Sequence, residues 1–319
     1  MPNPIYPPGL PLSNTYAGQF AGKYISAALL SAPTIENGGV TVMPNIKFKS
    51  VIQRVETASV LENASCDFQQ NATVTLTERI LEVKDLQVNM QLCKSQFHDS
   101  WLGIEQGFSS FDVLPKSFAD YLIAHVAAQV AEANEVSIWQ GSNAVSGQFD
   151  GLWSTALVDP LLPPAQLVPT AVITPANVIA QMQLVDDAIP ASLYGKADLK
   201  IYVSQNVAKA YVAALGGFGA IGLGSLANAG TNAQGSQWYT NGALSFNGTP
   251  IFMANGLPDD SMLATTTSNL YFGCSLLSDT QEVRTIDMSD IDGSQNVRVI
   301  MRMAAGATYG VIEDIVVYG

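Results

Sequence analysis

The pattern of apolar and polar positions divides the chain into segments of different character. Residues 1–12 contain five prolines, which favour an extended chain over a helix. Residues 16–32 fit one short helix that Pro33 ends, and turn signals follow at residues 36–39 and at Pro44. Because a proline-stiffened segment buries little surface on its own chain, the pattern predicts an N-terminal arm over residues 1–45 that needs a neighbour to lie on.

Between residues 46 and 92 the apolar positions follow a strand pattern on both sides of a polar stretch. Val51 and Val55 lie in the first run, Val74 and Leu76 open the second, and residues 62–71 between them are mostly polar. Strands of roughly 12 to 15 residues would extend roughly 40 to 50 Å at about 3.3 Å per residue. The pattern predicts an extended hairpin. Because an isolated two-stranded hairpin is only marginally stable in water, this one is expected to pack against a partner.

The clearest helical period runs over residues 117–140. Pro115 precedes it, Ser117 and Asp120 fit a capping box, and Gly141 follows its end. About 22 residues at about 1.5 Å each predict a rod of about 33 Å. The stripe of side chains at helical spacing consists of Phe118, Tyr121, Leu122, His125, Val126 and Val130.

After a Gly- and Pro-rich passage at residues 142–170, predicted helices and strands mix. Thr174 and Pro175 predict a helix start, residues 199–203 a buried strand, and Ser204 the cap of a helix that ends at residue 215. Residues 216–242 predict a long Gly-rich loop. Further strands are predicted at residues 244–252, 269–272, 283–288, 296–303 and 311–318, with an Asp-Gly turn at 292–293, and the whole order indicates an α+β fold.

Composition adds a reason to expect partners. Hydrophobic residues make up 48% of the 319 residues and charged residues only 13%, about half the usual share. Every apolar run is far shorter than the about 20 residues of a membrane span, and the start lacks a signal-peptide pattern. A chain with so little charge and no membrane span favours extensive protein–protein contact.

Charge and cysteine content exclude some classes of function. The net charge of −13 is unsuited to gripping a phosphate backbone, which requires clustered Lys and Arg. The three cysteines, Cys66, Cys93 and Cys274, are scattered and indicate reduced cytosolic thiols without metal-ligand spacing.

The sequence offers few candidates for catalysis. A Ser-His-Asp triad would need one of the two histidines. His98 is next to Asp99 and Ser100, but adjacent residues do not point at one another. His125 lies on the apolar stripe, which favours a core or interface histidine.

The binding motifs are equally weak. The string at residues 217–222 matches a dinucleotide fingerprint but follows a helix, so a loop is favoured. The acidic stretch from Asp287 to Gly293 lacks the terminal carboxylates of a calcium loop. Solvated carboxylates explain the pairs at 186–187 and 259–260. We therefore predict no catalytic residue, cofactor site or metal site, and no enzyme activity.

The order of segments resembles that of tailed-bacteriophage major capsid proteins with the Hong Kong 97-like fold, over essentially the whole chain. Three segments are also similar to capsid proteins of phages that infect Bacteroidetes: residues 40–45, residues 76–79 with 88–94, and residues 310–318. The resemblance implies an N-terminal arm (1–45), an extended hairpin loop (46–92), a peripheral domain (93–168 and 281–319) with a spine helix (117–140), and an axial domain (169–280).

The resemblance also implies a function. Copies of the chain would form hexamers and pentamers of an icosahedral shell that encloses double-stranded DNA in a virion, assembled in the cytoplasm of a bacterial host. Scaffolding, portal and decoration proteins are the implied partners. Capsids of this fold can join a Lys to an Asn between subunits; Lys47, Lys49 and Lys84 lie in the corresponding region, although no motif identifies their partner.

Two alternatives stay open. One is an encapsulin-type compartment of the same fold, which holds a protein cargo instead of a genome. The other, from a different class, is a cytosolic hydrolase or ligand-binding protein that uses a cleft in residues 170–280, against which the near absence of histidine argues.

Overall fold

The computed structural model of the chain describes residues 33–58, 66, 73–93, 116–215, 244–275 and 283–319. These residues belong to two compact units. One includes Val88–Ala127 and Val283–Met301, and the other includes Leu29–Gln87, Ala128–Glu282 and Arg302–Gly319.

In the first unit, β11 (Val283–Asp287) pairs antiparallel with the start of β12 (Asn296–Tyr309), so that Val283 lies opposite Met301. The short helix α7 (Ser289–Asp292) joins the two strands. Gly293 follows it with a φ of 71°, a backbone conformation that favours glycine, which confirms the turn predicted at this position.

A five-stranded sheet has the order β1-β10-β12-β11, and β4 (Lys84–Cys93) also pairs with β12. β1 (Thr41–Met43) runs parallel to β10 (Leu270–Cys274). Before β1, the helical turn α1 (Pro33–Glu36) begins at Pro33, because proline fits the first position of a helix. Thr34 and Val40 are buried, so this part of the predicted arm packs in the body of the subunit.

The long helix α3 (Lys116–Gln140) confirms the prediction for residues 117–140 to within one residue. Gly141 follows its end, as expected. The predicted cap at Ser117 and the first part of the stripe concern side chains outside the described residues. In the last turns of α3, Ile138 and Trp139 are fully buried in a core cluster that also includes the aromatic rings of Tyr202 and Phe272.

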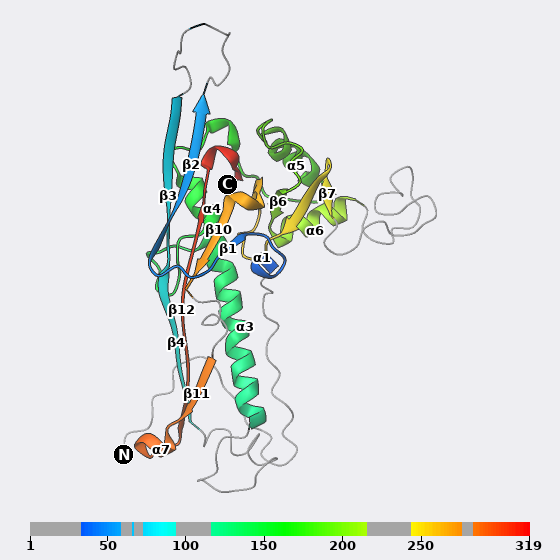
Figure 1. Cartoon of the computed structure of the whole chain (residues 1–319). Helices are drawn as coiled ribbons and strands as arrows, with labels where there is room; N and C mark the ends of the chain where they lie inside the picture. The colour runs from blue at the N-terminus through cyan, green and yellow to red at the C-terminus, as the bar shows by residue number, and fades with distance from the viewer. Residues whose placement is uncertain (1–32, 59–65, 67–72, 94–115, 216–243, 276–282) are drawn as a thin grey trace. The chain divides into compact units, whose positions relative to one another are not determined.

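The extended hairpin consists of β2 (Lys49–Ala58) and β3 (Thr73–Glu82), which pair antiparallel and lie side by side in Figure 1. The strand pattern that the sequence shows up to residue 92 does not belong to the hairpin alone. The strand breaks at Val83, whose N–H donates to Phe48 O and whose side chain packs against Ile46. Burial of Val83 turns the chain out of the hairpin, and β4 continues in the five-stranded sheet instead.

A six-stranded sheet has the order β5-β13-β9-β6-β8-β7. Its strands are β5 (Leu167–Val168), β6 (Leu199–Val203), β7 (Ser245–Phe246), β8 (Thr249–Met253), β9 (Met262–Thr266) and β13 (Val316–Tyr318). Figure 1 shows α5 (Val178–Asp187) and α6 (Gln205–Ala214) beside this sheet, with which they form a second core cluster. The mixture of helices and sheets confirms the α+β class.

Two helix starts differ in detail from the sequence pattern. α5 begins at Val178 and not at Pro175, because the Asn177 side chain bonds to Thr174 N and to Val172 O and holds residues 174–177 in a turn. α6 begins directly after Ser204 as expected. However, the Ser204 hydroxyl donates to Asn206 Oδ1 and makes no capping bond.

Three strands also differ from their predictions. The strand predicted at residues 244–252 is a tight hairpin, because Asn247 and Gly248 adopt φ values of 47° and 88° and reverse the chain. β12 continues to Tyr309 instead of ending at residue 303. The short helix η6 (Ile312–Asp314) occupies the beginning of the strand predicted at 311–318.

Several predicted features lie outside the described residues. They are the helix at 16–32, nearly all of the polar hairpin tip, His98 with its two neighbours, the glycine string at 217–222 and the loop at 216–242.

Candidate assembly surface

Strand alternation gives the hairpin two faces of different character. Cross-strand partners lie on the same face of a hairpin. One face, which we call the inner face, carries Ile52 and Arg54 of β2 together with Arg79 and Leu81 of β3. The other, or outer, face carries every second residue of each strand. It is built from the pairs Lys49–Glu82, Val51–Ile80, Gln53–Glu78, Val55–Leu76 and Thr57–Val74.

The inner face packs on the body of the same subunit. Leu81 is 0% exposed and forms a small core with Ile46, Val83 and Ala304. Ile52 packs against the same cluster. The base of the hairpin is therefore anchored by ordinary apolar burial.

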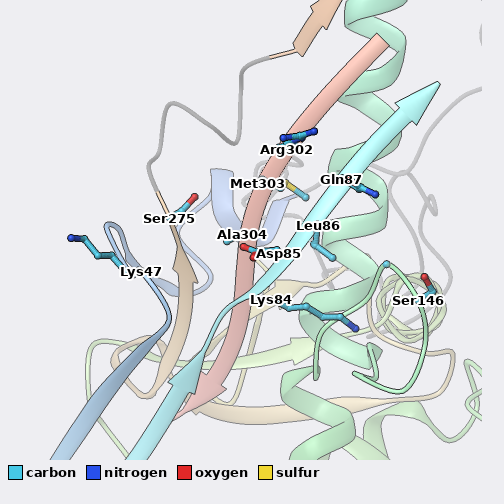
Figure 2. A pocket seen from close by; sticks show the side chains of 11 residues that line it. Lys47, Lys84, Asp85, Leu86, Gln87, Ser146, Ser275, Arg302, Met303 and Ala304 are labelled. Carbon is cyan, nitrogen blue, oxygen red and sulfur yellow. The ribbon is translucent and has the colours of Figure 1, made fainter. Parts of the chain in front are cut away.

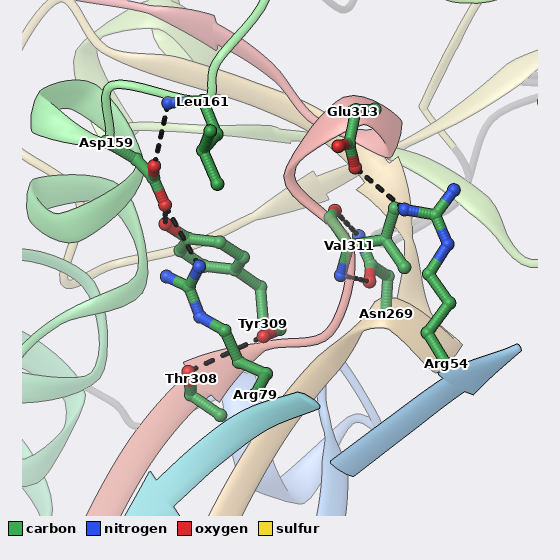
Figure 3. A network of polar contacts seen from close by, with 9 residues as sticks. All are labelled: Arg54, Arg79, Asp159, Leu161, Asn269, Thr308, Tyr309, Val311 and Glu313. Atoms are coloured by element: carbon green, nitrogen blue, oxygen red, sulfur yellow. Dashed lines mark hydrogen bonds and ion pairs between the residues drawn. The ribbon is translucent and has the colours of Figure 1, made fainter. Parts of the chain in front are cut away.

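Farther along the inner face, Arg79 reaches the carboxylate of Asp159, which follows helix α4 (Leu152–Val158). Arg79 Nη1 lies 3.0 Å from Asp159 Oδ2, and the guanidinium lies 4.0 Å from the centre of the Tyr309 ring. Tyr309, itself fully buried, donates its hydroxyl to the same Asp159 oxygen at 2.6 Å. Leu161 N donates to the other oxygen at 3.0 Å, as Figure 3 shows.

This network determines the protonation of both acidic groups. Desolvation by itself would raise the pKa of Asp159, but the hydrogen bonds from Tyr309, Leu161 N and Arg79, with the Arg79 charge, lower it below 3.8. Burial, followed by the hydrogen bond to Asp159, raises the pKa of Tyr309. At neutral pH the site therefore holds a carboxylate, a guanidinium and a neutral phenol.

A second, more exposed ion pair joins the hairpin to η6. Arg54 Nη1 lies 2.9 Å from Glu313 Oε2, with 33% and 51% of the two side chains exposed. The adjoining backbone is held by Asn269, whose side chain accepts from Val311 N at 2.7 Å and donates to Val311 O at 2.8 Å (Figure 3). Ion pairs as exposed as Arg54–Glu313 contribute little stability in water, about 0–1 kcal/mol.

The outer face carries five exposed aliphatic side chains among its polar ones. Among the described residues no other strand pairs with β2 or β3, which form a separate two-stranded sheet. An alternating set of aliphatic side chains on a sheet face ordinarily marks contact with something else. The exposed fractions are 49% for Val51, 62% for Val55, 61% for Val74, 65% for Leu76 and 54% for Ile80.

A buried carboxylate fastens the segment around α1 to α3. Glu135 is fully buried, and it accepts from Thr34 Oγ1 at 2.6 Å and from Thr34 N at 3.3 Å. Trp139 Nε1 donates to the same Thr34 hydroxyl at 2.8 Å. Burial raises the pKa of Glu135, and the hydrogen bonds from Thr34, the Gly256 backbone and Trp139 oppose that shift only in part.

Hollows on the second unit are open and lack converging chemical groups. One hollow of about 820 Å³ includes Lys47, Lys84, Asp85 and Arg302 in its lining. In Figure 2 the amino groups of Lys47 and Lys84 extend to opposite sides, and Lys84 Nζ donates to Asn143 O. A hollow of about 310 Å³ within residues 170–280 is lined by Tyr194, Gly195, Lys196, Ala197, Leu199, Asn247, Gly248, Thr249 and Pro250, without a nucleophile–base pair.

Three of the four carboxylates in the acidic pairs considered from sequence accept hydrogen bonds. Asp186 accepts from Asn247 and Asp187 from Gln183. Asp260 accepts from Ile173 N and from the Asn206 side chain, tying the chain before α5 to the start of α6.

The remaining acidic residues and the buried cysteine also have structural explanations. The carboxylates of Asp287 and Asp292 accept from Ser289 and Ser294 within their own turns. Cys274 is buried and its pKa is raised by desolvation. Among the described residues, no three His, Cys, Asp or Glu side chains form a group that could hold a metal ion. No helix in the described parts of the chain is long and apolar enough to span a membrane.

Sequence reasoning did not identify Arg79, Asp159, Tyr309 or Glu135 as sites of interest. Arg79 gave no distinguishing signal, because other positions of its register, among them Ser50 and Thr77, are also polar. Asp159 and Tyr309 are separated from it by 80 and 230 residues, so that only folding brings the three together.

No family model matches the sequence, and no curated protein is similar to it. Solved structures do resemble it. The capsid of the native GTA particle has a TM-score of 0.59 at 12% identity, with 93% of each chain covered. A structure from Mycobacterium phage Bobi has 0.57 at 12% identity, covering 94% of this chain and 93% of that one. The mature capsid of bacteriophage PhiM1 has 0.55 at 10% identity, covering 94% and 90%. The chain therefore has a phage capsid fold.

Proposed function

We propose that this chain is a major capsid protein that assembles with copies of itself into an icosahedral shell around double-stranded DNA. In this proposal hexamers and pentamers are the building units, the virion is the destination, and assembly takes place in the cytoplasm of a bacterial host. The role is structural and involves no catalysis. Scaffolding, portal and decoration proteins are its other proposed partners.

The observation that carries the proposal is the outer face of the hairpin. A two-stranded sheet with five aliphatic residues that are each about half or more exposed has too little cover of its own. A neighbouring copy that lies against this face would bury them, and a shell supplies every subunit with such a neighbour. The capsid fold and the low share of charged residues agree with this use.

We also propose that the fold is of the Hong Kong 97 type. Residues 1–45 would form the arm, 46–92 the region of the extended hairpin, 93–168 with 281–319 the peripheral domain, and 169–280 the axial domain. The long helix α3 would be the spine helix of the peripheral domain.

Negative-stain electron microscopy after size-exclusion chromatography tests the proposal on the purified full chain. We expect closed shells, or hexamers and pentamers that form shells as the concentration rises. A 33.8 kDa monomer at every concentration and ionic strength would contradict self-assembly. For shells isolated from producing cells, nuclease-protected double-stranded DNA supports the genome container, whereas a protein cargo would indicate an encapsulin-type compartment.

A further inference from the structure

The inner face of the hairpin contains one contact that is more specific than packing requires. Leu81 and Ile52 already bury the hairpin base. Arg79 lies farther out along β3, and its guanidinium is fixed both in direction and in plane, by the Asp159 carboxylate at its edge and by the Tyr309 ring against its face. A flexible ammonium group could not satisfy both constraints, because it has neither a plane nor a fork of donors.

The acceptor side of this contact is held by groups outside the hairpin. Asp159, whose side chain is 8% exposed, already receives the Tyr309 hydroxyl and Leu161 N. Tyr309 is the last residue of β12 and fully buried. Carboxylate and ring thus belong to the rigid body of the subunit, and Arg79 is the part contributed by the hairpin.

We propose that Arg79, Asp159 and Tyr309 form a latch that fixes the direction of the hairpin on its own subunit before its outer face meets another copy. The latch rests on the proposed shell function and makes Arg79 a positioning residue for assembly. A hairpin held in one direction loses little conformational freedom on association, so the latch lowers the cost of assembly without adding a contact between subunits.

The pair Arg54–Glu313 on the same face provides a matched control. It joins the same hairpin to the same body at a similar distance, 2.9 Å against 3.0 Å. Both of its side chains are more exposed than those of the latch, so water weakens this ion pair more strongly. Exchange of each arginine for lysine keeps the charge at both sites and removes the planar fork, so the effect should be larger at the less exposed latch.

The experiment compares wild type, Arg79→Lys, Tyr309→Phe and Arg54→Lys. Hydrogen–deuterium exchange is measured on unassembled subunits, and shell yield and diameter by light scattering and electron microscopy. For Arg79→Lys we expect amide exchange in residues 49–58 and 73–82 to be roughly tenfold faster, with exchange in the six-stranded sheet unchanged. The shell yield should fall and shell diameters should scatter. Tyr309→Phe should show the same effects more weakly, and Arg54→Lys should behave as wild type.

Three results would overturn the latch. They are unchanged hairpin exchange in Arg79→Lys, equal effects of Arg79→Lys and Arg54→Lys, or faster exchange throughout the body, which would make the arginine an ordinary stabilising residue. Failure of the shell proposal looks different, because wild type itself would then form no shell. The exchange measurement on subunits would still decide whether the latch holds the hairpin.

Discussion

The cross-strand pair Val55–Leu76 on the outer face of the hairpin gives the most direct test of assembly through this surface. The double variant Val55→Thr, Leu76→Thr places β-branched threonine at both positions, so the strands retain their propensity, but it replaces apolar surface with hydroxyl groups. Neither residue contributes much to the stability of the isolated subunit, since 62% of the surface of Val55 and 65% of that of Leu76 are exposed. We therefore expect the free energy of unfolding of the subunit to change by at most about 0.5 kcal/mol.

The effect on assembly follows from the exposed fractions. Complete burial of a valine or leucine contributes about 1.5–3 kcal/mol, and about two thirds of each side chain is still available for burial by a neighbour, or about 1–2 kcal/mol each. Because threonine retains one methyl group, we assign a loss of about 1 kcal/mol per side chain. The sum of about 2 kcal/mol for each contact corresponds to a roughly thirtyfold weaker association.

Static light scattering over a concentration series measures the concentration at which shells form, and urea denaturation of the subunit measures its stability. Leu76→Val is the matched control, since it differs from Leu76→Thr only by a methyl group in place of a hydroxyl. We expect the control to assemble near the wild-type concentration and the double variant to require a much higher one. Assembly of the double variant at the wild-type concentration would refute the contact through this face.

Three further predictions concern the subunit itself. Leu81→Ala should lower the free energy of unfolding by about 2–5 kcal/mol in urea denaturation, while Ile80→Ala, one residue away but 54% exposed, should change it far less. Gly306→Ala should lower the melting temperature, because the added Cβ would overlap the Glu82 carbonyl where β12 passes the end of β3. An unchanged melting curve would show that the two strands leave room for a methyl group there. Because burial raises the pKa of Glu135, the folded state holds the proton of this group more tightly than the unfolded state. The free energy of unfolding should therefore increase as the pH falls from neutral toward 4.5. Denaturation curves of Glu135→Gln over this range should lack that increase.

Local patterns predicted the elements that depend on their own sequence. Helix α3 has an uninterrupted helical period between Pro115 and Gly141, and the structure places it within one residue of the prediction. The alternation in β2 and β3 predicted the hairpin, and the Asp-Gly turn before β12 was found as expected. These features follow from the geometry of one segment, and the periods of helix and strand are visible in the residue order.

Other elements were decided by contacts between distant segments. β3 ends at Glu82 because the chain at Val83 is buried against Ile46 and Ala304, which the apolar run through residues 74–90 does not reveal. β12 continues through a run of alanines and a glycine that has little strand propensity, because close passage of the chain at Glu82 requires small residues there. The hairpin at Asn247–Gly248 could have been predicted locally, because an Asn-Gly dipeptide favours a tight turn between two strands.

The sequence by itself determined a chain of low charge with a two-stranded hairpin, a long helix and a mixed α/β block, and it suggested that much of its surface needs partners. It did not determine which face of the hairpin would be free. Alternation places Val55 and Arg54 on opposite faces but does not say which face turns inward. The tertiary structure decided this, because Leu81 is buried in the body and Arg79 meets a carboxylate and a ring contributed by residues 80 and 230 positions later.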